Sequence, residues 1–154
     1  MSKKGILLCL TVIAFLLALL VTLTLVLEHK TPAQAEIETY LGLSVEDGDV
    51  LYHTDSHGGF HGDGETCLIF SVSPENAEII EATWPKVSEN SQLSSFLSRK
   101  NEYNGSGFFL PAHGDDHGFF LDRSPEGQPD RWLNFVAAVY KPYLGQVYYY
   151  RFDS

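Results

Sequence analysis

The chain has few cysteines, although disulfides often stabilise small domains outside the cell. The chain of 154 residues has two cysteines, Cys9 and Cys67, and Cys9 lies within an apolar segment near the amino terminus. The chain after that segment therefore cannot form an internal disulfide, so its stability must come from its core. Cys67 begins the apolar run CLIF, which predicts a small buried residue rather than a nucleophile.

The short motifs that identify common enzyme and metal-binding classes are also absent. The sequence contains no HExxH, CxxC, P-loop, GxSxG or EF-hand pattern. No enzyme class can therefore be assigned from a motif.

Basic residues are scarce as well. From Thr31 to Ser154 there are 7 Lys and Arg against 19 Asp and Glu, so the formal charge is 7 − 19 = −12. Such a surface repels nucleic acid and anionic lipid headgroups, which excludes a nucleic-acid-binding function. It suits a well-solvated surface, a bound cation, or a basic partner such as an envelope protein.

One long apolar run, Ile6 to Leu27, stands out against this acidic background. Its 22 residues carry no charge, and as a helix they would span about 33 Å, enough to cross a hydrocarbon core of about 30 Å. Lys3 and Lys4 precede the run, so the positive-inside rule places residues 1–5 in the cytoplasm. The prediction is a single transmembrane helix at 6–27 in the plasma membrane, with the C-terminal domain outside.

The alternative is a cleaved signal peptide. Residues 28–35 are predicted to form a tether, and within it Ala33-Gln34-Ala35 matches a small-residue cleavage site. Cleavage before Glu36 would release a secreted domain. The apolar run is longer than the usual signal-peptide core, which favours a retained anchor.

The remaining chain, 36–154, predicts one small α+β domain with a mostly antiparallel sheet and one or two short helices. Ser73-Pro74-Glu75 is a typical helix start, and Ala77, Ile80 and Trp84 then fall on one face that would pack on the sheet. The segments with helical patterns are 35–41, 74–84 and 91–97, and the expected strands are 49–54, 65–72, 118–122, 132–140 and 146–152.

The tyrosine run Tyr148-Tyr149-Tyr150 lies in the last of these strands. Alternation along a strand predicts that its side chains point in turn to core and surface. A carbohydrate-binding platform is the less favoured interpretation.

The densest polar segment runs from His53 to Glu65 (HTDSHGGFHGDGE). If the flanking strands pair as a hairpin centred on Gly59, then His57 opposes His61, Asp55 opposes Asp63, and His53 opposes Glu65. Opposed residues share a face, and two facing carboxylates repel unless a cation or a proton lies between them. This predicts a divalent metal site formed by Asp55, His57, His61 and Asp63.

The competing interpretation is a loop. Gly58, Gly59, Gly62 and Gly64 would then supply turns, and the Asp and Ser side chains would bond to the loop backbone. A second pair, His113 and His117, would complete a four-histidine site only if its loop packs beside the first.

The motif HGGFHGDG, followed by a helix leading into Trp84-Pro85, by FFLDR and by a terminal VYYYRFDS, resembles small single-span extracytoplasmic proteins of unknown function from Gram-positive gut bacteria. The resemblance implies an anchored domain outside the cell and implies no catalytic residue.

Two functions remain open. One is a membrane-tethered, non-enzymatic binding or structural module. The alternative is a metal-dependent envelope hydrolase with a His/Asp centre.

Overall fold

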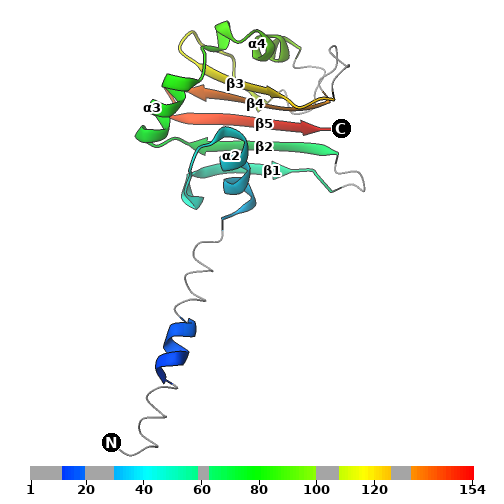
Figure 1. The fold of residues 1–154 in the computed structure, drawn as a ribbon. Coiled ribbons are helices and arrows are strands. Elements are labelled where there is room, and N and C mark those ends of the chain that lie inside the picture. The colour runs from blue at the N-terminus through cyan, green and yellow to red at the C-terminus, as the bar shows by residue number, and fades with distance from the viewer. Residues whose placement is uncertain (1–11, 20–29, 59–62, 100–107, 126–132) are drawn as a thin grey trace, which may run out of the picture. The chain divides into compact units, whose positions relative to one another are not determined.

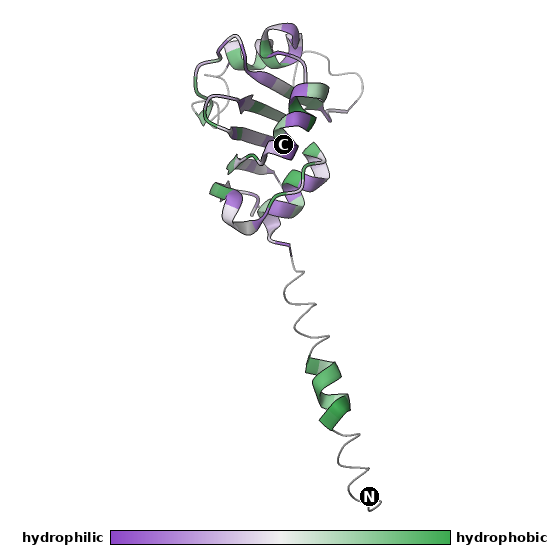
Figure 2. Ribbon diagram, turned by 90° about the vertical axis from the view of Figure 1, so that its left-hand side faces the viewer, coloured by the Kyte–Doolittle hydropathy of each residue, from purple (hydrophilic) through white to green (hydrophobic). Residues whose placement is uncertain are grey.

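The computed structural model of this protein describes residues 12–19, 30–58, 63–99, 108–125 and 133–154. The chain divides into two units, Met1–Thr31 and Pro32–Ser154. In the first unit residues 12–19 are helical, and Figure 2 shows this segment as hydrophobic. Within the described ranges, no helix has the length and apolar character needed to cross a membrane. The predicted span 6–27 extends beyond residues 12–19 at both ends.

The second unit confirms the predicted α+β class. Its elements are α2 (Pro32–Leu41), η1 (Asp47–Asp49), β1 (Val50–Asp55), β2 (Gly64–Ser71), α3 (Pro74–Thr83), η2 (Val87–Glu89), α4 (Ser91–Ser98), β3 (His117–Asp122), β4 (Asn134–Lys141) and β5 (Gln146–Asp153). The strands among the described residues form one sheet of five, in the order β1-β2-β5-β4-β3 (Figure 1). Every neighbouring pair is antiparallel.

Local signals explain where the helices begin and end. The Ser73 side chain accepts a hydrogen bond from the Asn76 backbone N–H at 3.2 Å, and Pro74 occupies the first helical position of α3. The helix ends before Pro85, as predicted. Helix α2 begins at Pro32, three residues earlier than expected, so part of the predicted tether is helical.

Helices cover both faces of the sheet. On one face α2 and α3 pack against a core that includes Leu68 and Tyr149, and Trp84 joins that core as predicted, with 7% of its surface exposed. On the other face α4 packs against a second core through Leu93 and Phe96.

The prediction that the tyrosine run would alternate between core and surface is wrong, because both faces of the sheet are covered. Tyr148, Tyr149 and Tyr150 alternate between the faces, but all three are buried because neither face is open. They cannot form an exposed carbohydrate platform. Cys67 is buried, as expected.

Candidate functional site

His57 lies just beyond the end of β1, where the chain turns back over β2. Its backbone N–H donates to Asp55 Oδ1 at 2.9 Å, and its ring Nδ1 lies 2.6 Å from the same oxygen. The turn depends on Gly64, because a Cβ there would lie 2.7 Å from the His57 backbone nitrogen. The glycine at position 64 therefore lets His57 fold onto the start of β2.

The second ring nitrogen of His57 reaches a residue almost a hundred positions away. Nε2 lies 3.2 Å from Asp153 Oδ2 at the end of β5, and 13% of the His57 side chain is exposed. A carboxylate thus faces each ring nitrogen. A neutral imidazole can donate to only one of them, whereas the imidazolium can donate to both.

Arg151, on the same face of β5, extends this arrangement. Its Nη1 donates to Glu36 Oε2 on α2 at 2.7 Å, and its Nε lies 2.9 Å from Asp153 Oδ2 in an ion pair. We call Glu36, Asp55, His57, Arg151 and Asp153 the His57 cluster. It joins α2 to the ends of β1 and β5.

Burial and charge shift the proton affinities within and beside this cluster. Partial burial by itself raises the pKa of Asp55, but the hydrogen bonds from His57 and the charges of His57 and Arg151 hold it below its usual value. Burial disfavours the Arg151 cation, but the Glu36 and Asp153 carboxylates keep its pKa above the usual value. Burial, and then the Glu36 carboxylate, raise the pKa of Tyr149 far above its usual range. Its hydroxyl therefore stays protonated and donates to Glu36 Oε1 at 2.6 Å.

Two more side chains close the outer side of the cluster. The guanidinium groups of Arg123 and Arg151 lie 5.0 and 5.6 Å from the centre of the Tyr40 ring. Arg123 Nη1 also donates to the Tyr40 hydroxyl at 3.0 Å. These contacts place the two cations against an aromatic ring on α2.

The contacts of the His57 cluster suit it to hold strand ends in place rather than to activate a nucleophile. A hydroxyl near the imidazole, Thr66 Oγ1, is 3.4 Å from Nδ1, and Asp55 already occupies that nitrogen at a shorter distance. A general base needs a free nitrogen directed at the group it deprotonates. His57 instead has both nitrogens occupied by carboxylates, so it fixes the end of the β1–β2 ribbon.

The predicted hairpin register is wrong by three positions. Asp55 pairs with Thr66 rather than Asp63, and His53 pairs with Leu68 rather than Glu65. The ladder ends where the Ser56 N–H donates to the Glu65 carbonyl at 2.9 Å. A shift by an odd number of residues moves every partner to the other face, so Glu65 and His53 lie on opposite faces. The stored repulsion between Asp55 and Asp63 therefore does not arise from strand pairing.

The structure describes three of the four predicted metal ligands, Asp55, His57 and Asp63. His61 lies outside the described residues, and Asp63 is exposed. In the ranges that the structure describes, no group of three or more His, Cys, Asp and Glu side chains is arranged to hold a metal ion. A divalent ion bound by Asp55, His57, His61 and Asp63 stays a prediction.

The four-histidine site is contradicted by the sheet. His117 begins β3 opposite Tyr140, near the end of β4, whereas His57 lies beside the end of β5, which pairs with the start of β4. His57 and His117 therefore lie at opposite ends of the sheet. His117 is buried, with Nδ1 at 2.8 Å from the Trp84 carbonyl oxygen, which makes it a core histidine.

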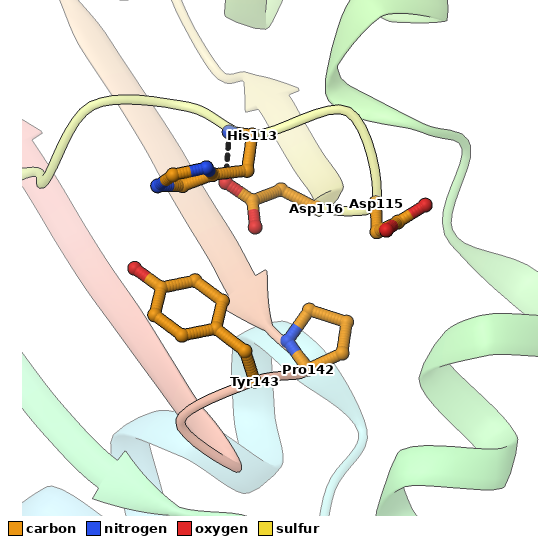
Figure 3. Close-up of a pocket in the computed structure, with 5 residues that line it drawn as sticks. All are labelled: His113, Asp115, Asp116, Pro142 and Tyr143. Atoms are coloured by element: carbon orange, nitrogen blue, oxygen red, sulfur yellow. Dashed lines mark hydrogen bonds between the residues drawn. The ribbon is translucent and has the colours of Figure 1, made fainter.

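A cleft opens at this second end of the sheet. It has a volume of about 540 Å³ and is lined by His113, Asp115, Asp116, Pro142 and Tyr143 (Figure 3). The His113 and Tyr143 rings meet edge to face, with centres 5.1 Å apart. Beneath them Asp116 Oδ2 accepts from Lys141 Nζ at 2.7 Å, and both of these side chains are fully buried.

Several residues of these sites escaped the sequence analysis. Glu36, Arg151 and Asp153 were not singled out, because they are distant in sequence from the glycine-rich segment. A weak signal was present: Arg151 and Asp153 follow Tyr149 at alternate positions, which places all three on one face of a strand. The partners across the sheet depend on strand order, which the sequence pattern did not specify.

No protein-family model, no curated protein and no solved structure is significantly similar to this chain. Functional inference must therefore start from the geometry.

Proposed function

We propose that this protein is a single-pass, membrane-anchored binding module whose domain lies outside the cell, recognises a basic partner and performs no catalysis. The observation that carries the non-catalytic part of the proposal is the pairing within the His57 cluster. His57 and Arg151 are each held by two carboxylates.

The anchoring part of the proposal is supported by the charge-free run at 6–27 and by the position of helix α2. Ala33 is buried in the core and the Gln34 side chain donates to the Val45 carbonyl at 3.0 Å. Cleavage before Glu36 would remove both of these residues from the folded domain. A retained anchor keeps α2 whole.

The basic partner is supported by the distribution of charge. Of the few cationic side chains in the domain, Lys141 is fully buried against Asp116, and Arg151 is largely buried between Glu36 and Asp153. The helix α3 meanwhile exposes Glu75, Glu78 and Glu81. Because these cations are buried together with their carboxylate partners, the large acidic excess of the composition remains at the surface, and such a field attracts cationic partners.

Topology is tested on intact cells from which the wall has been removed. External protease should digest the domain while the membrane is closed. Full protection until lysis would contradict an outside location. Release of the domain into the medium, with Glu36 as its first residue, would contradict the anchor.

Binding is tested with the full chain in nonionic detergent micelles. Poly-lysine should bind saturably, and the affinity should fall as salt screens the charges. Poly-glutamate serves as the matched polymer of opposite charge. Equal binding of both polymers, or no binding of poly-lysine at low salt, would contradict a basic partner.

A further inference from the structure

The carboxylate of Asp116 has one oxygen with no hydrogen-bond partner in the part of the chain that the structure describes. Its Oδ2 accepts from Lys141 Nζ at 2.7 Å and from the His113 backbone N–H at 2.8 Å. Its Oδ1 accepts no hydrogen bond from the described residues, and the whole residue is buried, with 0% of its surface exposed. Buried carboxylate oxygens are normally satisfied, so this oxygen identifies a position where a donor is missing.

The unpaired oxygen faces the cleft already described. Figure 3 shows Oδ2 bonded to the His113 backbone and the other carboxylate oxygen turned toward the space beside Pro142 and Tyr143. Of the side chains that line the cleft, His113 is exposed and Tyr143 has 59% of its surface exposed. Oδ1 itself is buried, so a ligand group reaches it only by displacing side chains of the lining.

We propose that this cleft binds a primary ammonium group, the end of a lysine side chain on the basic partner. This inference rests on the proposed function and names the site and the group that it recognises. The ammonium would donate to Asp116 Oδ1, while the methylene groups of the lysine would lie along Pro142 and the Tyr143 ring.

The groups at the cleft that would meet a cation are an unpaired carboxylate oxygen and an aromatic ring. Two lysines already lie beside its acidic residues: Lys141 pairs with Asp116, and Lys86 Nζ donates to the Asp115 backbone carbonyl at 3.1 Å, so these four side chains sum to 2 − 2 = 0 with His113 neutral. The preference for an ammonium group therefore comes from the unpaired Asp116 oxygen and the Tyr143 ring rather than from net charge. Lys141 already lies 6.0 Å from the centre of the Tyr143 ring, which shows that the ring accepts a cation nearby.

The walls of the cleft also favour an ammonium group over a sugar. An aromatic ring beside a carboxylate is a common site for cations, whereas sugar hydroxyls require several donors and acceptors. Here Lys141 Nζ is committed to Asp116 and to the Pro111 carbonyl at 2.9 Å. Hydroxyl binding therefore becomes an alternative outcome of the test.

The test follows histidine ring signals by NMR in the full chain, held in nonionic detergent micelles. N-acetyl-lysine amide is the probe and N-acetyl-norleucine amide, which lacks the ammonium, is its matched control. The His113 signal should shift saturably with a dissociation constant on the order of 1 mM. The His57 signal, at the other end of the sheet, should not move.

Two variants test the lining without disturbing the buried ion pair. Tyr143→Leu and Asp115→Asn should each weaken probe binding about fivefold, as expected for losing one cation–π or one charge contact. Asp122→Asn, at the far end of β3, removes the same charge as Asp115→Asn and should leave binding unchanged. Asp116→Asn is avoided because it would leave Lys141 buried without its counter-charge.

The outcomes separate the alternatives. Butylamine tests whether a free amine is sufficient. Weaker binding of butylamine than of the lysine probe supports a lysine within a protein as the ligand. Equal or tighter binding of butylamine would contradict a protein lysine as the ligand. Equal shifts with the norleucine control, a response to neutral sugars alone, or no His113 shift at all would overturn the ammonium site. If poly-lysine still binds and neither cleft variant weakens it, the basic partner stands and this cleft is not its site.

Discussion

Gly64 is the residue on which the geometry of the His57 cluster depends most directly. We expect Gly64→Ala to lower the free energy of unfolding by about 1–3 kcal/mol, because the new methyl group would overlap the His57 backbone. Thermal denaturation of the purified chain measures this effect. Gly58→Ala is the matched control, since a Cβ at position 58 would meet the Ser56 carbonyl oxygen only at 3.9 Å. Equal losses for the two variants would show that the close approach is unimportant.

Asp55 gives the cluster a pH dependence of known sign. Its pKa is lowered on folding, so its contribution to stability is present above the unfolded value of about 3.9 and is lost as the pH falls through the folded value. Asp55→Asn should therefore melt at a lower temperature than the wild type near pH 6, and the difference should disappear in strong acid. Because 42% of the side chain is exposed, the effect should stay below about 1 kcal/mol.

The control for Asp55 is Asp63→Asn, which removes an exposed carboxylate from the other side of the same loop. Its melting temperature should follow that of the wild type at each pH. An Asp55→Asn difference that grows toward acid pH would reverse the sign and contradict the assigned contacts.

At the scale of the elements, Trp84 links α3 to the sheet. The centre of its ring lies 5.5 Å from the centre of the Phe119 ring on β3, and 7% of the Trp84 surface is exposed. Trp84→Ala should lower the free energy of unfolding by about 3–5 kcal/mol, the range for truncating a large aromatic residue in a core. Chemical denaturation measures it. Ile79→Ala, on the exposed side of the same helix, should cost far less, and similar costs would place Trp84 outside the core.

The elements themselves could be predicted because their signals are local. Pro74 and Pro85 bracket α3, and short continuous apolar runs mark β2 and β5. The register of β1 on β2 could not be predicted in the same way. The glycines of the loop allow several turns, and the His57 ring beside the end of β1 also contacts Asp153 and Arg151 from the distant end of β5.

The candidate sites show the same division between local and distant information. His57, Asp55, His113 and the loop that holds Asp116 could be recognised as polar segments in the sequence. Their partners could not, because the order β1-β2-β5-β4-β3 decides which strand ends meet. That order also separates His57 from His113, which the sequence had left free to combine.

At the scale of the whole molecule, the point at which the folded domain begins is the feature most open to test. A fragment starting at Pro32 contains all of α2 and both cores, so it should melt cooperatively. Its melting temperature should not respond to reductant, because Cys67 is a free, buried thiol. A fragment starting at Glu36 lacks Ala33 and the Gln34 bond to Val45. It should lose about 1–3 kcal/mol of stability, as expected for a lost core contact and a lost hydrogen bond. If the two fragments melt alike, residues 32–35 add nothing to the fold, and the main structural argument against cleavage before Glu36 is removed.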